Sequence, residues 1–308
     1  MFSVIFPGQG SQMVGMGKEF YDNFDIVKNL FVQADDALKM SLSKTILEGP
    51  KDELDLTTNT QPAIFLISYS IYQVINKEFN IDLKKAKFFA GHSLGEYTAI
   101  ACADYLDFQD TIRILQIRGN AMQNSVPKGE GGMIAVLGTT VENIENILTE
   151  NKKNFLVEIA NDNSEGQIVL SGKSEDLEKL SSLLKQNKIK NIKLPVSAPF
   201  HCSLMKKATD IMRDELNKLN FKKGNIPLIS NFTANEIFNA DELKNLLIKQ
   251  IENRVRWRES VINMIEKGVN QFIEIGPGKV LSGLVKRINK DVKVSSINNQ
   301  DDIKEIKL

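Results

Sequence analysis

The sequence lacks the features that mark secreted, metal-clustered or membrane-embedded proteins. It has two cysteines and two histidines among 308 residues, too few for a disulfide framework or a cysteine–histidine metal cluster. No apolar run reaches the roughly 20 residues of a membrane-spanning helix. Residues 1–7 have no basic lead and end in proline, so we expect no signal peptide. These absences predict a cytoplasmic protein that needs no membrane and no metal.

An excess of either charge is also missing. Lysine plus arginine total 39 and aspartate plus glutamate total 39, so no overall basic field favours nucleic acid as a partner. Hydrophobic residues, in contrast, make up 42% of the chain, which predicts a sizeable core. A length of 308 residues suits one large domain with an insertion, or two domains.

The glycines near the N-terminus do not match a nucleotide-binding loop. Phe2–Phe6 is predicted to be a buried strand, and Gly8 and Gly10 follow it. The dinucleotide pattern then requires glycine at position 13, where the chain has Met13. The spacing of a phosphate loop fails in the same way. We therefore expect no cofactor.

One stretch indicates catalytic chemistry, and Ser93 is at its centre: Lys87-Phe-Phe-Ala-Gly-His-Ser-Leu-Gly-Glu-Tyr97. Its apolar start predicts the end of a buried strand, and a helical pattern follows over 96–106. Gly-x-Ser-x-Gly between a strand and a helix is typical of a nucleophile elbow, which exposes the serine oxygen at a sharp turn. The alternative is an ordinary strand-to-helix turn in which the serine is a cap.

A serine nucleophile needs a base, and the two histidines are the candidates. His92 adjoins Ser93, but neighbouring side chains on a tight turn diverge, so we expect His201 to accept the proton. The order serine then histidine is that of hydrolase-like folds. The sequence does not distinguish among the acids that could orient the histidine, which are Asp241, Glu252 and Glu274.

A buried arginine is the other unusual feature. The pattern over 110–123 predicts a helix, and on its wheel Arg118 falls between Ile114 and Met122 inside the apolar face. A guanidinium there is costly unless it is paired. It could form a structural ion pair with a carboxylate elsewhere in the chain, or it could bind an anionic substrate.

The middle of the chain has the pattern of an inserted small domain. Residues 131–196 predict the order β-α-β-β-α-β, with a polar loop over 161–166, and Gly129–Gly132 is a plausible hinge. We therefore expect a large α/β domain from residues 1–128 and 197–308, and a small domain from residues 129–196. Elsewhere the pattern predicts a loop over 49–62, a helix over 63–79 that Pro62 introduces, and a loosely held tail over 298–308.

Several further motifs give the chain a family resemblance. Together with the elbow and His201, they resemble the malonyl-CoA:acyl-carrier-protein transacylases of type II fatty-acid synthesis. The resemblance runs from Phe6 to about Ile288, and a free-standing chain of this length resembles the discrete enzyme. The motifs are Phe6-Pro-Gly-Gln-Gly-Ser-Gln12, Thr60-Gln-Pro-Ala63, Gln116-Ile-Arg-Gly119 and Glu274-Ile-Gly-Pro-Gly-Lys279.

The resemblance implies a hydrolase-like large domain with a parallel sheet and a ferredoxin-like small domain. It implies that Ser93 attacks the thioester of malonyl-CoA while His201 accepts its proton. In this family a main-chain carbonyl orients the histidine, and the matching residue is Gln250. No carboxylate would then be needed at that position.

The resemblance also implies how substrate is bound. Gln9 and the backbone N–H of Leu94 match the oxyanion hole, and Arg118 matches the arginine that binds the malonyl carboxylate. Phe200 resembles the malonyl-selective members, in which a bulky side chain limits the room for an α-methyl group. One departure is Arg254, where the family commonly has proline, and it leaves the path of the loop near Gln250 in doubt.

The partners implied are malonyl-CoA and holo-acyl-carrier protein, and we expect a monomer. Carrier proteins are acidic, so a basic docking surface is expected, and the candidates are Lys188, Lys190 and Lys193, or Lys286, Arg287 and Lys290. Two alternatives remain. A hydrolase would share the serine and histidine but has no need of the buried arginine. A non-catalytic scaffold should have lost at least one of these residues.

Overall fold

The chain begins with a strand at the centre of a parallel sheet. A computed structural model describes residues 1–196 and 198–308, and its first strand, β1 (Phe2–Phe6), is buried at all five positions. Within the described residues the sheet has the strand order β10-β9-β1-β2-β7-β8, and neighbours are parallel except β7 and β8. The other strands are β2 (Phe89–Gly91), β7 (Leu228–Ile229), β8 (Glu236–Ile237), β9 (Gln271–Ile275) and β10 (Lys293–Ile297).

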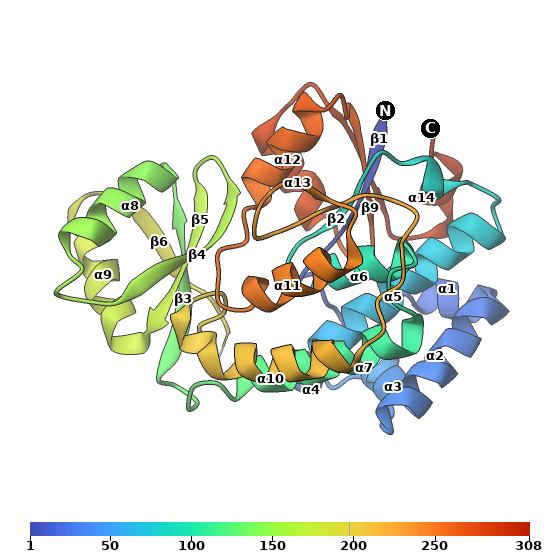
Figure 1. Cartoon of the computed structure of the whole chain (residues 1–308), viewed down its shortest axis with the longest axis horizontal. Helices are drawn as coiled ribbons and strands as arrows, with labels where there is room; N and C mark the ends of the chain where they lie inside the picture. The colour runs from blue at the N-terminus through green and yellow to red at the C-terminus, as the bar shows by residue number, and fades with distance from the viewer. Residues whose placement is uncertain (197) are drawn as a thin grey trace.

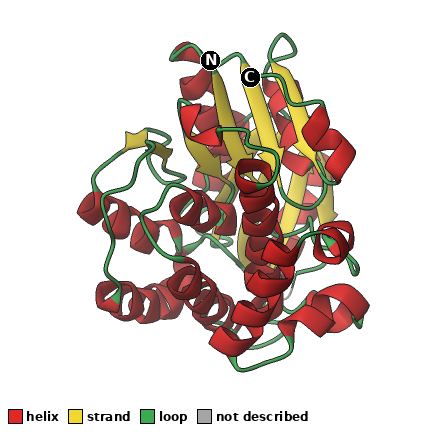
Figure 2. Cartoon of the chain, turned by 90° about the vertical axis from the view of Figure 1, so that its right-hand side faces the viewer, coloured by secondary structure: helices red, strands yellow, loops and turns green. Residues whose placement is uncertain are grey.

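Helices cover both faces of this sheet (Figure 2). Successive side chains of a strand point to opposite faces, and those of β1 are buried on both, so each face needs a covering layer. Val4 and Phe6 join the larger core, whereas Ile5 joins a second core with α12 (Trp257–Glu266) and α13 (Val280–Ile288). The larger core contains residues from α1 (Lys18–Asn23), α2 (Asp25–Leu38), α3 (Leu42–Glu48), α4 (Lys51–Leu54), α5 (Thr57–Lys77), α6 (Leu94–Cys102), α7 (Phe108–Gln123), α10 (Lys206–Lys218), α11 (Ala240–Gln250) and α14 (Gln300–Lys304). Two short 3-10 turns are η1 (Leu83–Lys85) and η2 (Ser203–Met205).

A separate antiparallel sheet lies beside the parallel one, at the left of Figure 1. Its strand order is β4-β5-β3-β6, and its element order is β-α-β-β-α-β. Leucines and isoleucines of its two helices pack on one face in a core of their own. The elements are β3 (Gly131–Leu137), α8 (Val141–Glu150), β4 (Val157–Ser164), β5 (Gln167–Lys173), α9 (Ser174–Gln186) and β6 (Lys190–Lys193).

The prediction of an α/β fold with a parallel sheet is confirmed. The antiparallel sheet lies inside the range predicted for the small domain, 129–196. The boundary predicted at residue 197 lies outside the described residues, and the division into two domains stays a prediction.

The predicted start of the long helix was wrong. Helix α5 begins at Thr57, so Pro62 lies inside it and does not introduce it. The side chains of Asn59 and Thr60 bond the carbonyls of residues 53, 54 and 56, which ties this polar first turn to the preceding segment. A proline removes one helical donor, and here that loss does not end the helix. The predicted loop over 49–62 therefore contains α4 and the first turns of α5, and the buried residues in those turns of α5 are Thr57, Asn59, Thr60, Gln61 and Pro62.

The predicted polar loop over 161–166 was too long, because only Glu165 and Gly166 form a turn. Strand β4 continues to Ser164 and pairs with β5 through two register shifts. Its polar side chains find partners outside the antiparallel sheet: Asp162 pairs with Arg258 of α12, and Asn163 bonds His92 beside the elbow serine. The pattern looked like a loop because these strand residues face polar groups and not an apolar core.

The C-terminal tail is not loosely held. Before it, β10 forms an edge strand on β9 that the sequence pattern did not indicate. Asn299 and Asp302 then form a capping box at α14, and Ile303 is fully buried. No periodic pattern predicted these elements, because α14 has one buried apolar residue, Ile303, and the edge strand β10 mixes polar and apolar residues.

Candidate active site

The turn that carries Ser93 is tight enough to require glycine on both sides. Strand β2 ends at Gly91 and α6 starts at Leu94, and Ser93 between them has φ 54° and ψ −108°. A Cβ atom on Gly91 would lie 2.0 Å from the backbone of Gly95, and one on Gly95 would lie 2.2 Å from the carbonyl oxygen of Phe6. The Gly-x-Ser-x-Gly pattern therefore follows from backbone packing, and the strained serine is held at the end of a parallel strand.

Ser93 and His201 lie within hydrogen-bonding distance. Ser93 Oγ is 2.8 Å from His201 Nε2, and His201 Nδ1 is 2.8 Å from the main-chain oxygen of Gln250. A carbonyl can only accept, so Nδ1 carries the proton and Nε2 is free to accept one from the serine. Burial, and then the charge of Arg118, lowers the pKa of His201 to about 3. The imidazole is therefore neutral near pH 7, as a base must be.

None of the three candidate acids orients the histidine, because the Gln250 carbonyl occupies that position. Glu274 is fully buried, but its carboxylate accepts the N–H groups of Leu281 and Ser282 and so caps α13. His92 is also directed away from the serine, since its Nε2 lies 2.8 Å from Asn163 Oδ1. Burial lowers the pKa of His92 to about 4.

Arg118 is buried beside the serine and is held by neutral groups. It is 1% exposed, and its guanidinium donates to Gln61 Oε1 at 2.7 Å and to Gln250 Oε1 at 2.9 Å. A third bond, from Nη2, reaches Ser93 Oγ at 3.0 Å. No carboxylate of residues 1–196 or 198–308 lies within ion-pair distance of it. The structural ion pair is therefore not found in the described chain, and the arrangement is suited to an incoming anion.

The start of α5 places one of these partners, Gln61, beside the arginine. A Cβ on Gly119 would lie 2.5 Å from the carbonyl oxygen of Thr57, so only glycine lets α7 approach α5 this closely. The approach brings Arg118 to Gln61 on the first turns of α5.

Gln9 and Leu94 are both close to the nucleophile. Gln9 lines the same cavity as Ser93, and its Nε2 is 3.3 Å from Thr57 Oγ1. Leu94 is the first residue of α6, where backbone N–H groups have no partner within the helix and favour negative charge. The geometry is compatible with an oxyanion hole made from these two groups.

A cavity of about 490 Å³ joins the two sheets at this point. Ser93 and Arg118 line it from the side of the parallel sheet, and His201 lines it from the loop before η2. Met133, Ala135 and Val169 line it from the face of the antiparallel sheet that α8 and α9 do not cover. Phe200 also lines it. The site is thus formed only when both sheets are present.

The loop at Arg254 is fixed by the small sheet. Arg254 Nη1 lies 2.9 Å from Glu145 Oε1 of α8, and the backbone of Val255 bonds Ala160 and Asp162 of β4. With Arg254 in place of proline, the loop therefore still follows a defined path, and the Gln250 carbonyl reaches His201.

Sequence reasoning missed three contributors. Asn231, just after β7, accepts from the Ser93 N–H and donates to the Gly91 carbonyl, so it clamps the turn. Glu96 and the side chain of Gln250 form a buried bonded pair behind Ser93. A polar residue at the carboxyl end of a parallel strand was the available signal for Asn231.

Two further findings concern other kinds of site. Among the described residues no group of His, Cys, Asp and Glu is placed to hold a metal ion. None of the helices in the described ranges combines the length and hydrophobicity that a bilayer crossing needs.

The fold and the arrangement of these side chains define a class: α/β acyltransferases that carry a serine on a tight turn between a strand and a helix. The family described as "Acyl transferase domain" matches residues 3–305. The malonyl CoA-acyl carrier protein transacylase of Bacillus subtilis (strain 168) is 42% identical over 301 residues, which are 97% of this chain and 94% of that protein. The chain belongs to the family of malonyl-CoA:acyl-carrier-protein transacylases, which confirms the resemblance.

Solved structures agree. An acyl-carrier-protein S-malonyltransferase from Bartonella henselae has a TM-score of 0.95 at 41% identity, covering 98% of this chain and 97% of that one. A malonyl-transacylase solved with a type II polyketide acyl-carrier protein has a TM-score of 0.94 at 36% identity, covering 98% and 97%.

Proposed function

We propose that this enzyme moves the malonyl group from malonyl-CoA to the phosphopantetheine thiol of acyl-carrier protein through a malonyl-Ser93 intermediate. The observation that carries the proposal is the 3.0 Å contact between Arg118 Nη2 and Ser93 Oγ in a buried site. A cation that close to the nucleophile selects acyl groups whose own carboxylate lies a short distance from the thioester carbonyl, as in malonyl.

In the first half-reaction Ser93 Oγ attacks the thioester carbonyl while His201 Nε2 takes the hydroxyl proton. Gln9 and the Leu94 N–H stabilise the oxyanion. The carbon–sulfur bond then breaks, and the CoA sulfur leaves with the proton from His201. In the second half-reaction the carrier thiol gives its proton to His201, attacks the acyl-serine and restores the Ser93 hydroxyl.

The cavity supports transfer over hydrolysis because it lies between the two sheets, which would limit the access of water to an acyl-serine. Phe200 narrows it and would limit the room for an α-methyl group, which favours malonyl over methylmalonyl. A hydrolase would share the serine and histidine, but the buried arginine has no role in it.

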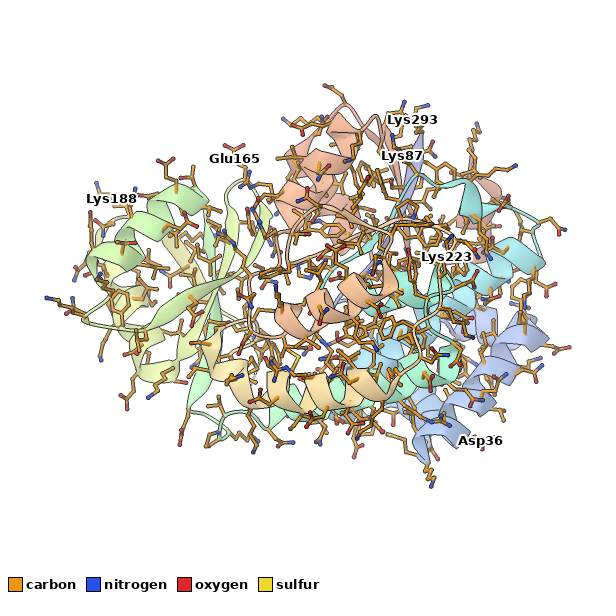
Figure 3. All side chains as sticks on the ribbon, viewed as in Figure 1. Asp36, Lys87, Glu165, Lys188, Lys223 and Lys293 are labelled. Carbon is orange, nitrogen blue, oxygen red and sulfur yellow. The ribbon has the colours of Figure 1, made fainter. Side chains whose placement is uncertain are left out.

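The acidic carrier would dock on a basic surface. Arg287 donates to Gln167, which lines the cavity, so Arg287 lies close to the cavity. Lys188 lies instead at the outer end of the small sheet (Figure 3). The position of Arg287 therefore favours the set Lys286, Arg287 and Lys290 over the set that contains Lys188. We further propose that the enzyme acts in the cytoplasm as a monomer, which light scattering of the purified protein tests.

Intact-mass measurement with malonyl-CoA alone tests the reaction. We expect a malonyl adduct on the wild type that is absent from Ser93→Ala and disappears when carrier protein is added. Arg118→Ala should lose the malonyl adduct and still accept an acetyl group. Release of free malonate without carrier would favour the hydrolase, and neither adduct nor turnover would favour the scaffold.

A further inference from the structure

Glu96 is a buried acid for which the reaction above has no use. It lies on the first turn of α6, three residues after the nucleophile, and is 1% exposed. Its Oε2 accepts from Gln250 Nε2 at 2.7 Å and from the Asn231 N–H at 3.2 Å. Its Oε1 has no hydrogen-bond partner among the described residues. Burying a carboxylate with one oxygen unpaired is costly, so the bonds that Glu96 does make call for an explanation.

Gln250 connects this acid to three parts of the active site. Its side-chain Oε1 accepts from Arg118 Nη2 at 2.9 Å, while Nε2 donates to Glu96 and, at 3.0 Å, to the carbonyl oxygen of Ser93. Its main-chain oxygen accepts from His201. The amide can meet Arg118 with its oxygen only when its nitrogen faces acceptors, and Glu96 provides the shortest of these bonds.

Electrostatics point the same way. The guanidinium of Arg118 has only neutral acceptors in contact, and Glu96 is the acid that faces it across the Gln250 amide. The aromatic ring of Tyr97, at 5.4 Å from the guanidinium carbon, is its other neighbour on α6.

We propose that Glu96 is a positioning residue for Arg118: through the side-chain amide of Gln250 it fixes the guanidinium where the carboxylate of the acyl group binds. This inference rests on the proposed function, because it concerns recognition of the malonyl carboxylate. Glu96 does not touch substrate. Glu96 accepts a hydrogen bond from the amide nitrogen of Gln250, and this bond favours the orientation in which the amide oxygen, and not the NH₂ group, faces Arg118.

A double-mutant cycle tests the relay. Ser93 acylation is followed by rapid quench against malonyl-CoA concentration, which gives the half-saturation concentration and the maximal rate separately. In Glu96→Ala we expect half-saturation to rise by about tenfold to a hundredfold, as for loss of a bond to a charged group, with a smaller change in maximal rate. Gln250→Met, which keeps the main-chain carbonyl, should do the same.

The double variant decides the mechanism. If Glu96 acts through Gln250, Glu96→Ala adds nothing to Gln250→Met, and the double variant equals Gln250→Met within about twofold. Effects that multiply would overturn the inference. Glu96→Gln keeps an oxygen for Gln250 and Asn231, so it should restore half-saturation to within about threefold of wild type. A Glu96→Gln variant as weak as Glu96→Ala would also overturn it.

Glu274→Gln is the matched control for a merely structural carboxylate. Glu274 is equally buried and accepts two backbone N–H groups, but it caps α13 outside the cavity. It should lower the melting temperature and leave half-saturation unchanged. If the wild type forms no malonyl adduct, the proposed function fails. If the wild type is active but the effects of Glu96→Ala and Gln250→Met multiply in the double variant, only the positioning role of Glu96 is refuted.

Discussion

Ser93 Oγ lies 2.8 Å from His201 Nε2, and both residues have a positive backbone φ, 54° for Ser93 and 58° for His201. Such angles are unfavourable for residues with a Cβ and persist only where the surroundings impose them. For Ser93 the surroundings are the two glycines and the Asn231 clamp. For His201 they include the bond from Nδ1 to the Gln250 carbonyl. The fold therefore stores strain at both partners of the proton transfer.

Gly91→Ala should destabilise the protein strongly. The new Cβ would meet backbone atoms of Gly95 at 2.0 Å, and backbone cannot rotate away as a side chain can. We expect the free energy of unfolding in urea to fall by about 3 kcal/mol or more. Gly283→Ala is the control, because open space surrounds Gly283 on α13, and it should gain about 0.5–1 kcal/mol. Equal stability of the two variants would contradict the steric account.

His201→Ala should slow Ser93 acylation by about 10²–10⁴-fold, because the serine then has no base. Half-saturation by malonyl-CoA should change little, since Arg118 remains in place. Rapid-quench acylation measures both quantities. A rate within tenfold of wild type would mean that another group takes the proton.

Acid should destabilise the native state through His201. Its pKa falls from 6.5 to about 3 because of burial and then the Arg118 charge, so below pH 6.5 only the unfolded chain takes up this proton. Between pH 6.5 and 5 this proton uptake should lower the free energy of unfolding by about 2 kcal/mol, a loss that His201→Asn should not show. Urea denaturation of both proteins at several pH values measures it.

The comparison of the two proteins removes an opposing effect. Burial raises the pKa of Glu96 to about 7, so this acid adds stability as pH falls through 7, and it does so in both proteins. If the free energy of unfolding depended on pH in the same way in wild type and His201→Asn, the assignment of His201 as a neutral, buried base would be refuted.

Phe200→Ala should relax acyl selectivity. Phe200 lines the cavity and is 7% exposed, so its removal opens room beside the acyl group. We expect the methylmalonyl-to-malonyl ratio of acylation efficiencies to rise about tenfold. Phe238→Ala is the control, because Phe238 is 46% exposed and not among the cavity residues. An unchanged ratio in Phe200→Ala would assign selectivity to another wall.

The chain determined several parts of this protein by itself. The elbow could be predicted because Gly91, Ser93 and Gly95 act within one turn, where sterics depend on adjacent residues. Arg118 could be placed on a buried face because helical periodicity is local. The resemblance then indicated Gln250, which the residues alone did not.

Only the tertiary structure decided the rest. It brought the carbonyl of Gln250 to His201 across 49 positions, started α5 at Thr57, and turned a polar stretch into strand β4. It also joined Glu96 to Arg118 through an amide 154 residues further along the chain. These contacts depend on which surfaces pack together, and sequence periodicity carries no information about the partner of a buried polar group.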